Sequence, residues 1–217
     1  MTPQRSALAA AQASIAGVDP LLDALVERHG PCRLPPPAPA ARRFEDLAES
    51  IAYQQLHGSA ARAIWGRVIT ACGGEVSADG LRVAGPGALR ECGLSGAKVR
   101  SMLDLAEREL DGRLRLTRIG RLDDEAVVAE LTPVWGVGRW TAHMFLMFTL
   151  GRLDVWPTGD YGVRAGYGRA FGHDAAPGEK EMGPLGDRFA GARSLVAWYC
   201  WRAVEDRGLA AAGRSTA

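Results

Sequence analysis

The fold is decided by residues 131–164, LTPVWGVGRWTAHMFLMFTLGRLDVWPTGDYGVR. This stretch holds a Gly-x-Gly turn, Gly136-Val137-Gly138, in front of an apolar helix, and an acid, Asp160, follows Gly138 by 22 positions. Two glycines one residue apart let the backbone turn tightly and present its N–H groups without obstruction. The helix that begins there adds unpaired N–H groups and the positive end of its dipole. The pattern predicts a phosphate-binding turn that lacks the lysine of a nucleotide-binding loop.

Around this stretch the chain is typical of an all-α protein. Alanine, leucine, glutamate and arginine dominate, and alternating β-branched runs are nearly missing. Residues 132–138 then form a short link between helices over 123–131 and 139–150. Asp19-Pro20 provides an N-cap with proline at the first helical position, and opens a helix that ends at Gly30. Further helices are expected over residues 4–16, 44–54, 59–72, 87–92, 95–110, 160–171 and 191–207.

Two segments are expected to interrupt the helices. Residues 31–43 contain five prolines, so they are expected to form a stiff connector rather than a regular helix. Residues 75–84, EVSADGLRVA, are expected to form a short hairpin or an irregular turn.

Size and charge limit what the chain can do. A chain of 217 residues can bury one sizeable core or two small lobes. The formal net charge is only +1, so any surface for nucleic acid must be local. All basic residues except Lys98 and Lys180 are arginine, which reflects genomic base composition as well as function. Arginines that could form a local patch are Arg62, Arg67, Arg139, Arg152, Arg164 and Arg169.

The cysteines and the apolar segments give no sign of a metal cluster or a membrane anchor. Cys32, Cys72, Cys92 and Cys200 are scattered without metal-ligand spacing, and the first residues do not read as a signal peptide. The apolar run over residues 142–150 is far too short to cross a bilayer. The expected location is the cytoplasm, in association with the nucleoid if the source is bacterial.

These motifs resemble those of the helix-hairpin-helix (HhH-GPD) DNA glycosylases, and within them the 3-methyladenine DNA glycosylase II, or AlkA-like, group. The family pattern combines Gly-hydrophobic-Gly-x-Trp-Thr-Ala, Leu-Gly-x-x-Asp and Pro-x-x-Asp. This chain supplies Leu131, GVGRWTA at 136–142, LGRLD at 150–154 and PTGD at 157–160. Upstream, residues 53–56 (YQQL) and 89–95 (LRECGLS) with Lys98 resemble two further signatures. The resemblance covers about residues 44–169.

The resemblance implies an all-α, two-lobed fold with the active-site cleft between the lobes, lacking the N-terminal β-domain of larger members. The whole chain, 1–217, is then one glycosylase unit. Residues 1–43 form N-terminal helices and the connector, 44–172 the core with the hairpin at 132–138, and 173–217 a C-terminal segment that completes a lobe. Some relatives carry a four-cysteine iron–sulfur cluster near the C-terminus. Only Cys200 lies there, so no iron–sulfur cluster is expected.

Asp160 is the expected catalytic residue. An aspartate before a helix is commonly an N-cap, and that role is compatible with catalysis because the helix start holds the carboxylate ionised. The resemblance implies that this carboxylate faces the deoxyribose of a flipped nucleotide. Cleavage of an N-glycosidic bond builds positive charge on the sugar. A fixed anion stabilises that charge and can orient the attacking water.

The resemblance also implies the kind of glycosylase. Bifunctional members carry a lysine where this chain has Trp140, so a monofunctional enzyme without lyase activity is expected. A flipped, electron-poor base is held on aromatic faces. The expected base pocket comprises Trp140, Met144, Trp156 and Tyr161. Some members have an aromatic residue in place of Met144. The aromatic residues at 198, 199 and 201 are expected to pack into the core instead.

The remaining site residues are expected to contact DNA or a cation. Phosphate contacts are expected from the main chain of Gly136, Gly138 and Thr141, with the threonine hydroxyl as a further donor. Gln55 and Leu56 lie where the family inserts a side chain into the gap left by the flipped base. In the family, carbonyl groups of the hairpin also hold a monovalent cation, Na⁺ or K⁺. The corresponding carbonyls in this chain are those of Thr132, Val134 and Val137. No cofactor is expected for catalysis.

The sequence therefore predicts a monofunctional DNA glycosylase that flips and excises alkylated bases, of the 3-methyladenine and 7-methylguanine type, in base excision repair. Its expected partner is double-stranded DNA containing damaged bases, and it is expected to act as a monomer away from membranes. Two alternatives stay open: a glycosylase for another lesion, such as uracil or hypoxanthine, and a non-catalytic DNA-binding module.

Overall fold

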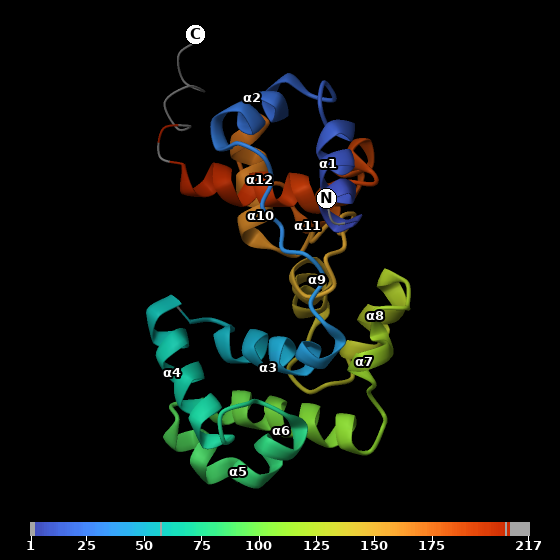
Figure 1. The fold of residues 1–217 in the computed structure, drawn as a ribbon. Helices are drawn as coiled ribbons and strands as arrows, with labels where there is room; N and C mark the ends of the chain where they lie inside the picture. The colour runs from blue at the N-terminus through green and yellow to red at the C-terminus, as the bar shows by residue number, and fades with distance from the viewer. Residues whose placement is uncertain (1–2, 57, 207, 209–217) are drawn as a thin grey trace. The chain divides into compact units, whose positions relative to one another are not determined.

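The computed structural model describes residues 3–56, 58–206 and 208, and all regular elements among them are helices (Figure 1). The all-α prediction is therefore confirmed. These residues divide into two compact units. Unit 1 combines residues 1–37 with 151–217, and unit 2 is the continuous segment 38–150. The cleft expected between the lobes stays a prediction.

Unit 2 contains most of the hairpin stretch. Its helices are α3 (Arg43–Tyr53), α4 (Gly58–Ala71), α5 (Ala78–Glu91), α6 (Gly96–Leu110), α7 (Leu116–Ile119), α8 (Asp124–Leu131) and α9 (Arg139–Phe148), with a 3-10 turn, η1, at Ala40–Arg42. Helix α5 lies alongside α6, and α3 contacts α4, α6 and α9 (Figure 1). Helix α3 therefore connects α9, the helix that follows the hairpin, with α4 and α6.

The sequence of α3 shows why this helix occupies the interior of unit 2. Its buried side chains are Phe44, Leu47, Ala48, Ile51 and Ala52. They recur at the i, i+3, i+4 and i+7 spacing that lines one face of a helix. Leu47 and Ile51 are fully buried, and burial of each contributes about 1.5–3 kcal/mol.

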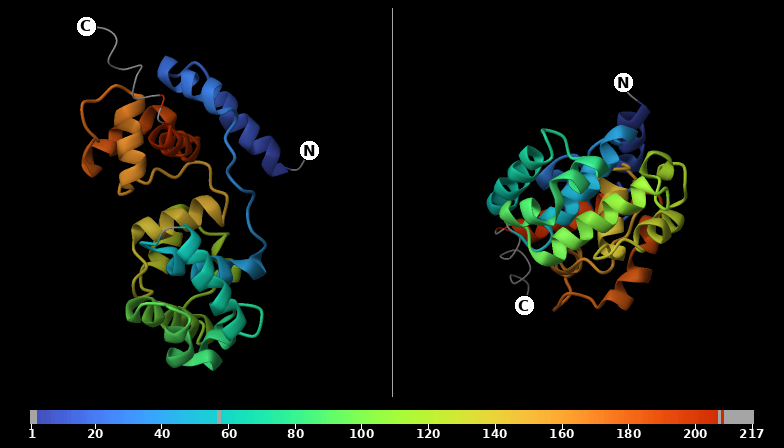
Figure 2. Two further views of the ribbon diagram at one scale, coloured as in Figure 1. Left: turned by 90° about the vertical axis from the view of Figure 1, so that its left-hand side faces the viewer. Right: turned by 90° about the horizontal axis from the view of Figure 1, so that it is seen from below.

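Unit 1 is built from both ends of the chain. Its elements are α1 (Pro3–Ser14), α2 (Pro20–His29), α10 (Tyr161–Ala170), α11 (Glu179–Leu185), the 3-10 turn η2 (Asp187–Phe189) and α12 (Arg193–Glu205). Figures 1 and 2 show α10 crossing α12 steeply. The crossing is close because Gly166 has no side chain: a Cβ there would collide with the carbonyl of Cys200.

The N-terminal helices are part of the same core. Asp19 caps α2 as expected, with its side chain accepting from Leu21 N–H at 2.8 Å. The Tyr199 hydroxyl of α12 lies 2.9 Å from Gln12 Oε1 and 3.0 Å from the carbonyl oxygen of Gly30, and donates to one at a time. These contacts fasten the N-terminal segment to the C-terminal helix, so the two ends of the chain fold together.

The prediction for residues 75–84 is wrong. The Ser77 side chain accepts from Gly80 N–H at 3.1 Å and caps α5, which begins at Ala78. The helix kinks at Gly85, whose φ of 71° is a left-handed conformation that favours glycine. Pro86 then restarts the helix. The glycine and proline mark a kink inside one helix rather than a hairpin.

Other boundaries also differ from the expectation. Helices α7 and α11 and the two 3-10 turns were not predicted, and η1 lies inside the proline-rich connector. The expected segment end at residue 172 falls within unit 1, because α10 packs on α12. Arg207, the expected last residue of the C-terminal helix, lies outside the described residues, and α12 ends at Glu205.

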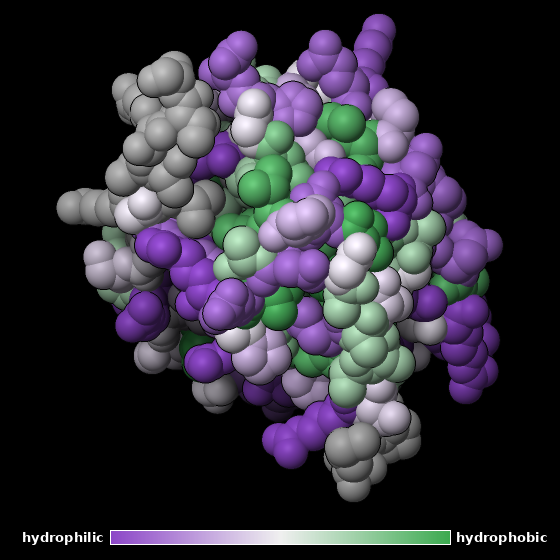
Figure 3. Space-filling model, turned by 90° about the horizontal axis from the view of Figure 1, so that it is seen from above, coloured by the Kyte–Doolittle hydropathy of each residue, from purple (hydrophilic) through white to green (hydrophobic). Residues whose placement is uncertain are grey.

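The surface is that of helices that bury one face. Figure 3 shows hydrophilic residues interspersed with small apolar patches on the side seen from above. No helix in the described part of the chain is both long and apolar enough to cross a membrane.

Candidate active site

Asp160 is held at the start of α10 in unit 1. It is the N-cap residue, and its Oδ1 accepts from Val163 N–H at 2.8 Å. The residue is only 8% exposed. The positive end of the helix dipole favours the ionised carboxylate at this position. The acid predicted from the sequence is therefore a fixed, largely buried carboxyl group.

Helix α12 provides a second hydrogen bond to the same oxygen. Trp201 Nε1–H donates to Asp160 Oδ1 at 3.0 Å. Gly162 makes room for this indole, since a Cβ there would lie 2.9 Å from Trp201 Cδ1. Burial, and then the negative charge of Asp160, raise the pKa of the neighbouring Cys200 thiol. Cys200 therefore stays a neutral thiol.

The loop that leads to Asp160 is fastened to the start of α12. The Ser194 hydroxyl accepts from Val155 N–H at 2.9 Å and donates to the Arg152 carbonyl at 2.8 Å. Asp154 forms a bidentate ion pair with Arg193, with both distances at 2.7 Å. Burial alone would raise the pKa of Asp154, but its hydrogen bonds to Arg193 outweigh burial and lower it. The conformation before Asp160 is thus set by α12.

The aromatic residues of unit 1 separate into core and surface. Trp156 was expected in the base pocket, but it is 8% exposed and its Nε1–H donates to the Met182 carbonyl at 2.7 Å, so it is a core residue. Tyr199 is buried in the core as predicted. Trp201 was assigned to the core as well, yet it contacts Asp160. Tyr161, next to the acid, is 69% exposed, and the Arg164 guanidinium lies 5.6 Å from the centre of its ring.

The hairpin of unit 2 has the predicted bounds, with α8 ending at Leu131 and α9 beginning at Arg139. Gly136 adopts a left-handed φ of 78°, and a Cβ there would collide with Ser101 Oγ. Gly138 differs: its φ of −96° suits any residue, and a Cβ would have open space around it. Gly136 is thus required by the fold, whereas Gly138 keeps the surface in front of α9 unobstructed.

The N-terminus of α9 is exposed to an approaching anion. Gly138 is its N-cap and has no side chain that could cap the helix. The first intrahelical bond runs from Ala142 N–H to the Gly138 carbonyl, at 3.1 Å. The N–H groups of the first turn precede that bond and, with the helix dipole, favour a phosphate.

Gln54, the C-cap residue of α3, fixes the hairpin, a contact that was not predicted from the sequence. Its Nε2 donates to the Gly136 carbonyl at 3.2 Å and to Thr141 Oγ1 at 3.1 Å. The Thr141 hydroxyl was expected to contact phosphate, but it is buried and bound to Gln54. Only the main chain of Thr141 remains a candidate for a phosphate contact.

The turn after α3 presents the two expected wedge residues. Gln55 is exposed and has a φ of 56°, the one left-handed residue other than glycine in the described part of the chain. Such strain costs of the order of 1–2 kcal/mol and is typical of functional turns. Leu56 is 37% exposed. Lys98 steadies the end of α3, since its ammonium donates to the Ala52 carbonyl at 2.8 Å.

Helix α9 carries the other expected pocket residues. Trp140 is 42% exposed and Met144 is partly buried one turn later. Residues four apart lie on one face of a helix, so these two side chains share a face. Phe148, 40% exposed, continues the same face by another turn. Trp140 and Met144 belong to unit 2, whereas Asp160 and Tyr161 belong to unit 1.

The carbonyls expected to hold a cation lie in the hairpin turn. Thr132 is the C-cap residue of α8, and its N–H donates to the Val128 carbonyl at 3.0 Å. The Val134 carbonyl accepts from Val137 N–H at 3.0 Å, which leaves one of its two lone pairs. Carbonyl oxygens are suitable ligands for an alkali cation, so the turn fits Na⁺ or K⁺ chemically.

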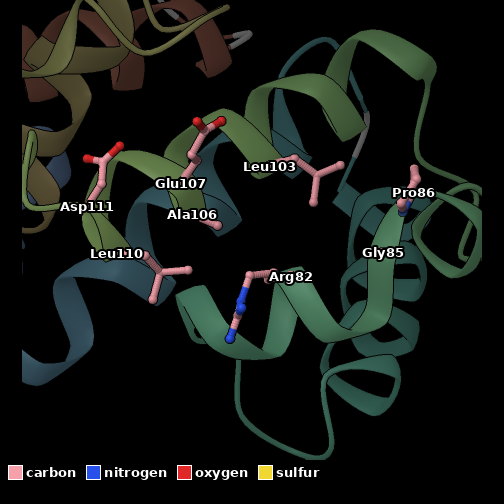
Figure 4. Close-up of a pocket in the computed structure, with 8 residues that line it drawn as sticks. All are labelled: Arg82, Gly85, Pro86, Leu103, Ala106, Glu107, Leu110 and Asp111. Carbon is pink, nitrogen blue, oxygen red and sulfur yellow. The ribbon is translucent and has the colours of Figure 1, made fainter.

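A pocket of about 500 Å³ in unit 2 does not belong to this site. Its floor is apolar, with Leu103, Ala106 and Leu110 of α6, and Arg82 of α5 lies across from them (Figure 4). Ser101 and Asp104, the residues of α6 that contact the hairpin, do not line this pocket. This pocket is therefore separate from the hairpin surface.

Comparisons with known proteins bear on these features. The profile of the HhH-GPD superfamily of base excision DNA repair proteins matches residues 48–185. DNA-3-methyladenine glycosylase 1 of Schizosaccharomyces pombe is 30% identical over 200 residues, which cover 91% of this chain and 88% of that protein. The solved structure of an S. pombe 3-methyladenine DNA glycosylase with abasic DNA matches at a TM-score of 0.82 and 30% identity, covering 91% and 97% of the two chains. The solved structure of a DNA-3-methyladenine glycosidase from Bacillus halodurans matches at a TM-score of 0.77 and 33% sequence identity. The match covers 93% of this chain and 89% of that chain.

Proposed function

The chain belongs to the HhH-GPD superfamily of base excision DNA repair proteins, and from that membership we propose that it is a monofunctional DNA glycosylase that excises alkylated bases from duplex DNA. The observation that carries the proposal is the carboxylate of Asp160, fixed by Val163 and Trp201. The names of its relatives, 3-methyladenine glycosylases, support alkylated purines as substrates. A pure binding module would need no fixed anion of this kind.

The proposed role of Asp160 is electrostatic. Breaking the N-glycosidic bond leaves positive charge on the deoxyribose in an oxocarbenium-like transition state. A preorganised carboxylate stabilises this charge and can orient the attacking water. Because its two hydrogen bonds are already formed, the carboxylate needs little reorganisation when the charge appears.

The substrate class follows from the leaving group and from the exposed aromatic faces. N3- and N7-alkylated purines are cationic and depart without a general acid. Trp140 in unit 2 and Tyr161 in unit 1 each expose part of an aromatic ring. An exposed ring of this kind can hold such a base through stacking and a cation–π attraction of about 0.5–2 kcal/mol. Tryptophan cannot form a Schiff base, so Trp140 supports hydrolysis that leaves an abasic site uncut.

DNA binding is assigned to the hairpin and to the turn after α3. In this proposal the main chain of Gly136, Gly138 and Thr141 binds phosphate, and Gln55 or Leu56 fills the gap left by the flipped base. The carbonyls of Thr132, Val134 and Val137 would hold Na⁺ or K⁺, and the charge of that ion would neutralise part of the phosphate charge. The protein acts on damaged double-stranded DNA as a monomer.

Trp201→Phe tests the positioning of the acid. Phenylalanine keeps most of the ring packing but removes the Nε1–H that holds Asp160. The expected result is a fall of about 10-fold in the single-turnover rate of base release, because a displaced catalytic group loses part of its effect. The matched control is Trp198→Phe in the same helix, since Trp198 contacts Tyr199 and Arg202 rather than the acid. Equal single-turnover rates for Trp201→Phe and Trp198→Phe would show that Trp201 does not position Asp160 for catalysis.

Gly138→Val tests the phosphate-binding turn. The backbone at Gly138 accepts any residue, and its Cβ would have open space, so the fold is expected to remain intact. The valine side chain would keep a phosphate away from the start of α9. Affinity is expected to fall about 10-fold for undamaged and abasic duplexes alike, since phosphate contacts carry little sequence information. Unchanged affinity for an abasic duplex would contradict this assignment.

A panel of duplexes tests the choice of lesion. Each duplex carries one site of 3-methyladenine, 7-methylguanine, hypoxanthine or uracil, and the rate of base release is measured under single-turnover conditions. The proposal predicts that the two methylated purines are released faster than uracil, because they are cationic. Faster release of uracil would assign the enzyme to a different lesion.

A further inference from the structure

Trp135 projects from the hairpin beside the proposed phosphate-binding turn. It directly precedes Gly136, and it is 38% exposed. Its main chain is anchored, because its N–H donates to Asp104 Oδ2 at 2.7 Å. The anchor uses the backbone, and the side chain of Trp135 keeps more than a third of its surface exposed. The side chain is therefore available for a contact outside the protein.

The anchor itself is rigid and charged. Asp104 accepts from Arg108 Nε at 2.9 Å, one turn further along α6. Burial alone would raise the pKa of Asp104, but the hydrogen bonds from Trp135 N–H and Arg108 together lower it. Asp104 thus stays ionised at neutral pH and holds the hairpin against α6. The orientation of Trp135 is fixed before any ligand arrives.

Arg100 of α6 covers one face of this indole. Its guanidinium carbon lies 4.3 Å from the centre of the Trp135 ring, within the range of a cation–π contact. Arg100 is exposed, and it forms no ion pair with a carboxylate among the described residues. A guanidinium that stacks by its face still has N–H donors along its edge. Stacking therefore orients these donors without using them.

We propose that Trp135 and Arg100 form a second DNA contact next to the hairpin turn. In this contact Arg100 binds a backbone phosphate neighbouring the one held at the start of α9, and the indole packs against the deoxyribose beside it. The proposal rests on the proposed function, since it needs DNA on the hairpin. It adds one positive charge and one apolar surface to a turn that otherwise contributes main-chain N–H groups.

The chemistry favours this ligand for two reasons. Arginine binds phosphate through paired donors in a fixed plane, and here that plane is held in advance by the indole. The open N-terminus of α9 directly follows the hairpin, so both features attract the same phosphate chain. The pocket of Figure 4 is lined by neither Arg100 nor Trp135. Its Arg82 is an exposed arginine paired with Asp79 and serves as a comparison.

The test measures binding to a duplex that contains an abasic-site analogue, at several salt concentrations. Arg100→Gln is compared with Arg82→Gln, which removes the same charge away from the hairpin. The slope of log K against log salt is negative, and each phosphate contact makes it steeper by about 0.9. Arg100→Gln is expected to reduce the slope by about one such contact and to weaken binding about 5- to 10-fold at low salt. Arg82→Gln is expected to leave both values unchanged.

A second variant separates the indole from the charge. Trp135→Leu is expected to weaken binding about 3- to 5-fold with little change in salt slope, because the backbone anchor to Asp104 remains. An Arg100→Gln variant with the wild-type slope and affinity would overturn the proposal, whatever the protein does to damaged bases. If Arg100→Gln reduces the steepness of the slope but the wild-type protein releases no base, the DNA contact is supported and only the proposed glycosylase function is contradicted.

Discussion

Replacing Asp160 with asparagine is expected to lower the rate of base release by about 1,000-fold, while affinity for an abasic duplex stays within about 2-fold of wild type. Asparagine keeps the shape of the side chain, and its Oδ1 can still accept from Val163 N–H and Trp201 Nε1–H. It also remains a good N-cap for α10. The substitution therefore removes the negative charge and little else. The measurement is single-turnover release of methylated bases, together with duplex binding.

Two controls make the result for Asp160→Asn specific. Asp174→Asn removes one negative charge from an exposed position of unit 1, and its rate is expected to equal that of wild type. Asp160→Ala loses the cap as well as the charge, so it is expected to destabilise unit 1 by about 1 kcal/mol in addition. If Asp160→Asn kept more than a tenth of the wild-type rate, the carboxylate would not be the principal catalytic group.

Gly166→Ala is expected to destabilise the protein by about 3 kcal/mol, the largest effect on stability that we expect from a single methyl group. A Cβ at Gly166 would overlap the main-chain carbonyl of Cys200, and backbone cannot move aside as a flexible side chain can. Helices α10 and α12 would have to separate. Because Asp160 begins α10 and Trp201 lies on α12, base release is expected to fall as well.

Thermal and urea unfolding measure the effect of Gly166→Ala. Gly66→Ala is the matched control, since Gly66 lies within α4 and a Cβ there meets nothing within 4 Å. That control is expected to be neutral or to stabilise by about 0.5–1 kcal/mol, because alanine favours the helix. A loss of less than 1 kcal/mol for Gly166→Ala would mean that the two helices are not as tightly packed as the structure indicates.

Local signals in the sequence were sufficient for the hairpin and for the acid. The two glycines, and the helix-forming segments on either side, predicted the link over residues 132–138, and α8 and α9 end and begin at those bounds. The N-cap role of Asp160 was predicted for the same reason, because a cap depends on the few residues that follow it. The all-α class followed from composition.

Contacts between distant parts of the chain could not be predicted in this way. Gln54 reaches Gly136 across 82 positions, and Trp201 reaches Asp160 across 41. No spacing rule connects such residues, so Trp201 was assigned to the core and Gln54 received no role of its own. Trp156 was predicted to lie near the acid because it is close to Asp160 in sequence. In the structure its side chain is buried in the core of unit 1.

The errors in helix assignment have a different cause. Around residue 85, glycine and proline are as typical of a turn as of a kinked helix, and the cap at Ser77 is a weak signal by itself. Helix α11 contains Pro184 and is only seven residues long, so its pattern is too short to be recognised. The extent of unit 1 depends on α10 packing against α12, which only the structure reveals.

The central claim is tested most directly by the products that the wild-type protein makes from methylated duplex DNA. Free bases are separated by chromatography, and strand breaks are scored before and after alkali. We predict release of 3-methyladenine and 7-methylguanine, with breaks that appear only after alkali because an intact abasic strand remains. Breaks without alkali would contradict the monofunctional mechanism. Tight binding without release of any methylated base would contradict the assignment as an alkylbase glycosylase.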